Sequence, residues 1–288
     1  MTFSEEWPLM FFTLLTQFAV GTYIFIVVVR TFSKKLGQEK CMKLTGLGMT
    51  VTGPVMLAAL ILSLFHLGTP AGAYRAVLNW GSSWLSREIL FAGLFFVLWF
   101  IGYVMEKKGT WSQVLGWLNT VVGIAAIYSM SSIYAATVMP AWTDFNTYLS
   151  FFGTTAVFGA AGTVLFMLLS KEEKNEQVMS VLKIVGITGI VAVLLQLIYL
   201  PIYASALAAE GAVGVKSLSV LAGNHLYTTV FRWILTAGGL AIILHGVFRK
   251  TMTKAVAQLA AVAFVLVVAG EFLGRFIFYA LGIPIDIG

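Results

Sequence analysis

Eight long apolar runs divide this sequence, and they constrain its fold more than any other feature. A helix that crosses a bilayer needs about 20 consecutive, mostly apolar residues, and windows of about 19 residues pick out such segments. The segments are expected at about residues 8–29, 44–67, 87–105, 114–138, 148–169, 181–204, 227–247 and 256–279. The sequence therefore predicts an all-α, polytopic integral membrane protein with eight transmembrane helices.

The composition excludes the other broad classes of protein. Of 288 residues, 59% are hydrophobic and 10% are charged, whereas a soluble domain has about 45–50% apolar and about 25% charged residues. Disorder is excluded as well, because it requires low hydrophobicity and high charge. The connections between the segments are short, so residues 1–288 are expected to form a single membrane domain. Short connections also favour antiparallel neighbours in one or two four-helix bundles.

The basic residues predict how the chain is oriented. Most of the 18 lysines and arginines follow the first, third, fifth and seventh segments, and such loops face the cytoplasm. Both termini are then expected outside the cytoplasmic membrane. The net charge of +6 does not indicate nucleic-acid binding, because the basic residues form short clusters between apolar runs. A cleavable signal peptide begins with basic residues, whereas this sequence has Glu5 and Glu6 there. The first segment is therefore expected to stay in the mature protein.

Small and special residues give further expectations. Cys41 is the single cysteine, which excludes a Cys-ligated iron–sulfur cluster or structural zinc site within this chain. Pro201 is expected to kink or end the sixth helix. Several glycines are expected at close helix contacts; they are Gly116, Gly123, Gly159, Gly162, Gly186, Gly238, Gly270 and Gly274.

Ionisable residues within the apolar segments are few, and each costs about 2.5–3.5 kcal/mol at a helix centre. They gather toward the predicted outer side, and no comparable cluster is expected on the inner side. They are His66, Arg87, Glu88, Arg232, Glu271 and Arg275. Glu271 and Arg275 are four residues apart, on one helix face at pairing distance. Whether they form a structural pair or contact a ligand stays open.

His66 ends the second segment and Glu88 begins the third, on either side of a loop over residues 68–86. His66 alone could be an interfacial histidine, and Glu88 alone could be held by the helix dipole. Together, at one depth and beside lipid, they predict a site for a lipid-soluble ligand whose polar head exchanges protons. In this loop Pro70 is expected to start a short interfacial helix, with Trp80 and Trp84 at headgroup level.

Four motifs extend this interpretation: EWPLM at residues 6–10, HLGTP at 66–70, SREI at 86–89 and GEFLGR at 270–275, followed by FY at 278–279. In these motifs, their order and the chain length, the sequence resembles the membrane anchor subunit of bacterial dimethyl sulfoxide reductases. The resemblance implies a haem-free anchor subunit for anaerobic respiration. It implies two partners on the outer (periplasmic) face, a ferredoxin-like iron–sulfur subunit and a molybdopterin catalytic subunit.

The resemblance also implies a reaction and its residues. The protein would oxidise menaquinol and pass the electrons to the iron–sulfur subunit, while the catalytic subunit sets the terminal acceptor. His66 and Glu88 match the catalytic positions, and the quinol-binding set is His66, Gly68, Arg75, Arg87 and Glu88, with Arg232, Glu271 and Arg275 as a supporting polar cluster. No metal ligand is expected in this chain. The basic residue of the loop departs from the family pattern, since it stands at Arg75 rather than near Gly72.

This assignment agrees with the chemistry of the residues. Quinol oxidation releases two electrons and two protons, so its site needs a group that holds a ring oxygen and a group that accepts protons. The His66 imidazole exchanges a proton near neutral pH, and Glu88 can relay protons outward. Arg75 or Arg87 would then tune the Glu88 carboxylate.

Two other functions stay open. A b-type cytochrome anchor would need two facing histidines, and His66 with His225 is one such pair, the remaining histidine being His245. A small-solute transporter usually has ionisable residues near the bilayer midplane, whereas here the deeper polar residues are Asn119 and Gln196, which suit packing hydrogen bonds.

Overall fold

The computed structural model describes residues 3–33, 36–66, 79–249 and 254–284, and these residues are almost entirely helical. The helices are α1 (Phe3–Phe32), α2 (Gln38–His66), α4 (Trp84–Lys107), α5 (Gln113–Ala135), α6 (Pro140–Thr143), α7 (Asn146–Leu169), α8 (Glu176–Ala209), α9 (Gly211–Ser219), the π-helix η3 (Val220–Asn224), α10 (Leu226–Phe248) and α11 (Lys254–Ala280). Within these ranges, 8 helices are long and apolar enough to cross a membrane. The prediction of an all-α polytopic membrane protein is confirmed.

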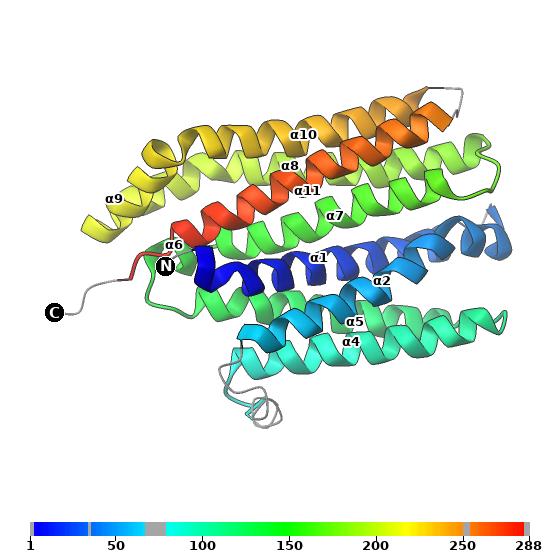
Figure 1. Ribbon diagram of the computed structural model, residues 1–288, viewed down its shortest axis with the longest axis horizontal. Helices are drawn as coiled ribbons and strands as arrows, with labels where there is room; N and C mark the ends of the chain where they lie inside the picture. The colour runs from blue at the N-terminus through cyan, green and yellow to red at the C-terminus, as the bar shows by residue number, and fades with distance from the viewer. Residues whose placement is uncertain (1–2, 34–35, 67–78, 250–253, 285–288) are drawn as a thin grey trace.

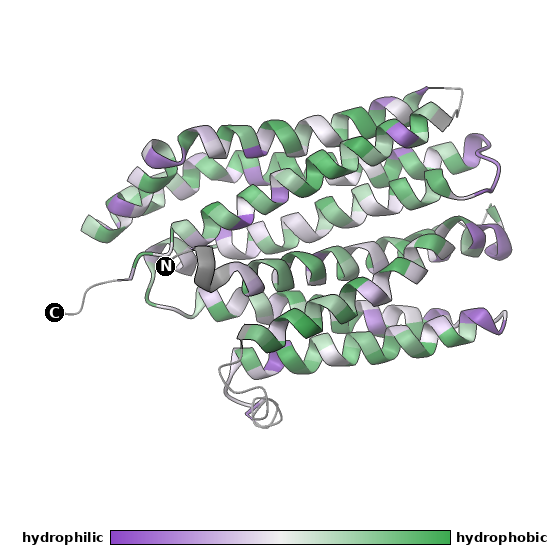
Figure 2. Cartoon of the chain, viewed as in Figure 1, coloured by the Kyte–Doolittle hydropathy of each residue, from purple (hydrophilic) through white to green (hydrophobic). Residues whose placement is uncertain are grey.

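The long helices form two groups of four that lie side by side (Figure 1). Helices α1, α2, α4 and α5 pack together as the first bundle, and α7, α8, α10 and α11 pack together as the second. The contact of α1 with α7 joins the two bundles. Apolar residues cover most of the helix surfaces over their middle lengths (Figure 2), as expected for helices surrounded by lipid.

The two ends of the molecule differ in charge. The start of α1, the end of α11, α6 and α9 lie at one end, which we call the terminal end (Figure 1). The last residues of α1, α4, α7 and α10 lie at the opposite end, the basic end, where hydrophilic residues gather (Figure 2). This alternation is the one that the distribution of lysine and arginine predicts. Which end faces the cytoplasm stays a prediction.

Side-chain caps explain where several helices begin. The Ser83 hydroxyl accepts a hydrogen bond from the Ser86 N–H at the start of α4, and Asn175 accepts one from Val178 N–H at the start of α8. Such caps satisfy backbone donors that the first helical turn leaves free. Helix α8 continues through Pro201 to Ala209, so of the two expected effects, a kink or the end of the helix, the second was wrong. Neighbouring groups can compensate the lost backbone bond in a membrane helix.

The bundles meet through a very close backbone contact. A Cβ atom on Gly21 of α1 would lie 2.1 Å from the Thr155 carbonyl oxygen of α7, and one on Gly159 would lie 2.5 Å from the Gly21 carbonyl oxygen. Only glycine allows helices to approach so closely. The packing role predicted for Gly159 is confirmed, and the one predicted for Gly238 was wrong, because nothing lies within 4 Å of its Cβ position.

Candidate functional site

Glu88 is a carboxylate buried inside the first bundle. It lies just beyond the first turn of α4 at the terminal end, and only 2% of the residue is exposed. Among the described residues no hydrogen bond or ion pair to its carboxylate is found. A buried carboxylate without a fixed partner is costly to keep, and it is a group suited to exchanging protons with a ligand.

Arg87, the preceding residue, has a different role in the structure. Its Nε donates to the Trp80 carbonyl oxygen at 2.8 Å and its Nη2 donates to the Gly81 carbonyl oxygen at 2.7 Å. The guanidinium also lies 4.2 Å from the centre of the Trp84 ring. Successive helix residues point about 100° apart, and no ion pair between Arg87 and Glu88 is found in the described residues. Arg87 therefore stabilises the turn that leads into α4.

The other members of the predicted quinol site lie mostly outside the described residues. His66 is the last residue of α2, and its side chain, together with Gly68, Arg75 and the helix expected at Pro70, is outside the described part. Helices α2 and α4 pack against each other, and α2 ends where α4 begins, at the terminal end (Figure 1). The fold thus places the end of α2 at the same level as Glu88, while the roles of these residues stay predictions.

A pair of buried tyrosines lies next to this region. The Tyr134 hydroxyl of α5 and the Tyr279 hydroxyl of α11 are 2.5 Å apart, and both Glu88 and Arg275 interact electrostatically with Tyr134. The Tyr134 ring also makes an edge contact with Trp142 at 5.1 Å. The tyrosine pair therefore connects the first bundle to the last helix of the second. Nothing in the apolar pattern of the sequence singles it out, because buried tyrosines are common in helical cores.

Glu271 occupies the centre of a polar cluster in the second bundle. Its carboxylate accepts hydrogen bonds from the Thr154 hydroxyl at 2.5 Å and the Thr236 hydroxyl at 3.3 Å. Arg232 Nη2 lies 4.0 Å from the same carboxylate and donates to Gln196 Oε1 at 3.2 Å. Four helices, α7, α8, α10 and α11, are thus linked around one buried carboxylate.

Arg275 turns away from Glu271 toward the first bundle. Its Nη2 donates to Gln17 Oε1 of α1 at 2.8 Å, and its guanidinium lies 3.8 Å from the centre of the Phe151 ring. No ion pair joins Glu271 to Arg275 in the described residues, so of the two alternatives left open by the sequence the direct structural pair is not formed. The two threonines and Arg232 satisfy Glu271, and Gln17 offers Arg275 an acceptor. Sequence reasoning missed Gln17, Thr154 and Thr236 because uncharged polar residues are frequent in membrane helices.

The basic end also has a buried charged pair, contrary to the sequence-based expectation. Arg30, in the last turn of α1, is bonded to Glu106, close to the end of α4, and the arginine side chain is only 1% exposed. Both residues lie just past the apolar windows, so hydropathy alone assigned them to loops. The packed helix ends bury them.

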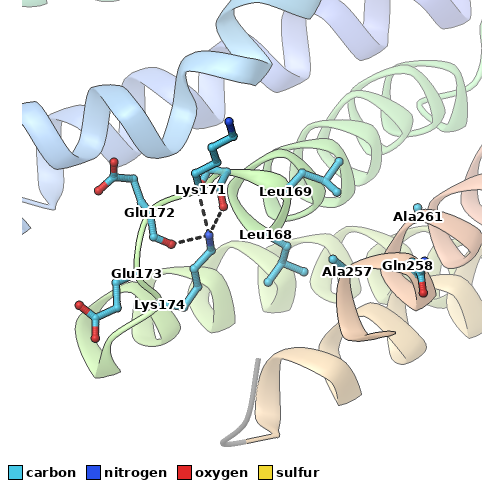
Figure 3. A pocket seen from close by; sticks show the side chains of 10 residues that line it. Leu168, Leu169, Lys171, Glu172, Glu173, Lys174, Ala257, Gln258 and Ala261 are labelled. Atoms are coloured by element: carbon cyan, nitrogen blue, oxygen red, sulfur yellow. Dashed lines mark hydrogen bonds between the residues drawn. The ribbon is translucent and has the colours of Figure 1, made fainter. Parts of the chain in front are cut away.

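A large hollow at the basic end is far from Glu88. It has a volume of about 730 Å³ and lies between the α7–α8 turn and the first turns of α11 (Figure 3). Lys174 Nζ donates to the carbonyl oxygens of Ser170 and Glu172 within the turn, so its charge stabilises the turn itself. None of the predicted site residues lines this hollow.

Similarity to known proteins identifies the family of this chain. The model of the DMSO reductase anchor subunit (DmsC) family matches residues 1–281. The protein belongs to the DMSO reductase anchor subunit family. The buried carboxylate in the first bundle of this anchor subunit is Glu88, which belongs to the SREI motif at residues 86–89.

Curated relatives agree with this membership over the full length. The anchor subunit is 26% identical to the anaerobic dimethyl sulfoxide reductase protein YnfH of Escherichia coli, with 96% of this sequence and 95% of the relative covered. It is 27% identical to the corresponding anaerobic dimethyl sulfoxide reductase subunit of Haemophilus influenzae, with 96% and 94% covered. A sulfite dehydrogenase subunit of Allochromatium vinosum is 28% identical over a shorter region, 44% of this sequence and 43% of the relative.

The positions of the histidines bear on the cytochrome alternative for this anchor subunit. His225 precedes α10 and makes an edge contact with Phe276 at 5.5 Å, while His245 Nε2 accepts a hydrogen bond from Arg249 Nε at 3.2 Å near the basic end. His66 ends α2, and α2 and α10 belong to different bundles (Figure 1). This arrangement counts against His66 and His225 as the two axial ligands of one haem.

Proposed function

We propose that this protein is the membrane anchor and menaquinol-oxidising subunit of an anaerobic dimethyl sulfoxide reductase-type molybdoenzyme in the bacterial inner membrane. The observation that supports a quinol site is the burial of Glu88 without a hydrogen-bond or ion-pair partner among the described residues, about one helix turn from the end of the bundle where α2 also ends. Membership of the anchor family supports the assembly.

The proposed chemistry divides the work between two side chains. Oxidation of menaquinol to menaquinone releases two electrons and two protons. The His66 imidazole holds one quinol oxygen, and the Glu88 carboxylate accepts a hydroxyl proton and passes it outward. Gly68, Arg75 and Arg87 belong to the same proposed site, with Arg87 shaping the turn that precedes Glu88.

The electrons leave this subunit for a partner. Cys41, the single cysteine, is buried in α2 near the basic end, so an iron–sulfur cluster with cysteine ligands must belong to another subunit. We assign this role to a ferredoxin-like iron–sulfur subunit, followed by a molybdopterin catalytic subunit. Both dock on the periplasmic face at the terminal end, where α6, α9 and η3 provide segments outside the long helices. Protons and electrons then leave on the same side, and turnover itself does not charge the membrane.

Substitution of Glu88 tests this proposal in the complete complex. Glu88→Gln keeps the shape of the side chain and removes its ability to accept a proton as a carboxylate. We expect menaquinol-dependent reduction of the terminal acceptor to fall by at least about 10-fold, since general acid–base groups contribute about 10²–10⁴-fold. Reduction driven by a reduced viologen dye, which delivers electrons without the quinol site, stays unchanged. His66→Ala is expected to behave in the same way.

A matched control uses another glutamate. Glu39 is 83% exposed and pairs with Lys43 on the surface of α2, so Glu39→Gln should leave both activities intact. Unchanged menaquinol oxidation in Glu88→Gln would refute the proposed role of Glu88. Loss of both activities would mean that the complex had not assembled.

A further inference from the structure

Four buried nitrogen atoms in the second bundle have no hydrogen-bond partner among the described residues. They are Arg232 Nε, Trp233 Nε1, and Arg275 Nε and Nη1. Each of these nitrogens carries a hydrogen and can only donate. The other buried side-chain atoms without a partner in the described residues are the amide of Asn119 and the hydroxyls of Thr16, Thr22, Tyr23 and Thr163, and a hydroxyl can donate or accept. The four nitrogens of the second bundle therefore lack an acceptor.

The charges in the same place do not balance. The two guanidinium groups of Arg232 and Arg275 share one carboxylate, Glu271, which interacts electrostatically with both. No other carboxylate in the described residues forms an ion pair with either arginine. Within this cluster the two guanidinium groups therefore outnumber the carboxylates, and a buried charge without a compensating partner is strongly unfavourable.

A small cavity lies against two of these residues, Arg232 and Trp233. Its volume is about 40 Å³, and its polar lining comes from Asn146, Ser150, Gln196, Thr229, Arg232 and Trp233. One water molecule takes up about 30 Å³ in the liquid, so the cavity holds a single atom-sized ligand. A quinol ring or a phosphate group is too large for it.

We propose that this cavity binds one small monovalent anion of the class of chloride. Arg232 supplies the charge, and the Trp233 indole N–H, the Ser150 hydroxyl and the Asn146 amide supply further donors around the cavity. A water molecule could accept hydrogen bonds at this place, but it would leave the extra positive charge uncompensated. The bound anion compensates the positive charge of the cluster around Glu271 and stabilises the packing of α7, α8, α10 and α11. This role is separate from quinol oxidation.

Anion exchange on the purified complex tests the site. The complex in mild detergent is transferred from gluconate, which is too large for the cavity, to chloride or bromide at equal ionic strength. We expect the temperature at which this anchor subunit aggregates, followed by immunoblot, to rise by several degrees and to saturate with halide concentration. Crystals grown in bromide should show an anomalous scattering peak in the cavity.

Two variants separate the site from general salt effects. Arg232→Gln removes the charge, and Ser150→Val keeps both arginines but fills the cavity; each should abolish the halide-dependent rise. Lys43→Gln, on an exposed pair, should retain it. Equal stability in gluconate and chloride, or a halide response that survives in Ser150→Val, would overturn the proposal. A cavity with solvent density and no bromide peak would also overturn it and identify the occupant as water.

Discussion

Arg30 and Glu106, which are 76 residues apart in sequence, form a bidentate ion pair, with Arg30 Nη1 2.8 Å from Glu106 Oε2 and Nη2 3.0 Å from Oε1. Arg30 Nε donates to the Thr45 hydroxyl at 2.8 Å, and the guanidinium lies 4.4 Å from the centre of the Trp111 ring. This arginine therefore ties α1 to α2, α4 and the turn before α5 at the basic end.

Removal of this arginine should be strongly destabilising. Arg30→Gln leaves the mostly buried Glu106 carboxylate, whose side chain is 14% exposed, without its cation. Removing one partner of a buried ion pair costs about 3–5 kcal/mol of stability. We therefore expect a large fall in the unfolding temperature of the purified protein and a smaller amount of the protein in membranes. Thermal unfolding in detergent measures the first effect.

The double variant Arg30→Met/Glu106→Met gives the contrast. Replacing both partners by apolar residues removes the desolvation cost of both charges and is often close to neutral, so the double variant should be more stable than Arg30→Gln. Lys43→Gln, which breaks the exposed Glu39–Lys43 pair, should change stability by no more than about 1 kcal/mol. If Arg30→Gln were as mild as Lys43→Gln, the buried pair would not stabilise the fold.

The glycine contact between the bundles predicts a second mutational effect. In Gly21→Ala the new methyl group would meet the Thr155 carbonyl oxygen at 2.1 Å, so α1 and α7 must move apart. Overpacking of this kind costs about 1–3 kcal/mol or more. Gly238→Ala is the matched control, because nothing lies within 4 Å of its Cβ position. Thermal unfolding should separate the two variants clearly, and equal stability would contradict the close contact.

The hydrogen bond between Tyr134 and Tyr279 predicts coupling between the bundles. Tyr134→Phe and Tyr279→Phe each remove one side of the 2.5 Å contact, and a buried hydrogen bond contributes about 0.5–1.5 kcal/mol net. The double variant should therefore lose less stability than the sum of the single variants. Denaturation of all four proteins measures this coupling. Strict additivity would show that the two hydroxyls act independently.

The sequence was sufficient to predict the fold at the level of helices. The eight apolar runs and the alternation of basic loops follow from the cost of placing polar groups in lipid, which acts on every residue locally. The ends of helices were less predictable. Helix α8 continues beyond Pro201 to Ala209, and α4 extends past Glu106 to Lys107. Packing and capping, rather than hydropathy, determine where these two helices end.

The candidate site was predictable only in its ionisable members. Glu88, Arg232, Glu271 and Arg275 stand out in a sequence because charge is rare in apolar segments. The structure buries the two glutamates and Arg275 almost completely and leaves 12% of the Arg232 side chain exposed. Their partners could not be predicted in the same way. Arg275 donates a hydrogen bond to Gln17 of the other bundle because α1 packs against the second bundle. A contact of this kind cannot be predicted from the local sequence pattern.

The metal content of the complex is the prediction that separates the proposed function from its rivals. Purification through a tag on this protein, from its native membranes in mild detergent, should yield molybdenum and iron without haem. The sequence has one cysteine and belongs to the anchor family. The two candidate haem histidines are at the end of α2 and just before α10, and these helices belong to different bundles (Figure 1). Elemental analysis and a reduced-minus-oxidised absorption spectrum provide the measurement, with untagged membranes as the control. Stoichiometric haem would support a cytochrome anchor, and a complex without any metal would support a transporter.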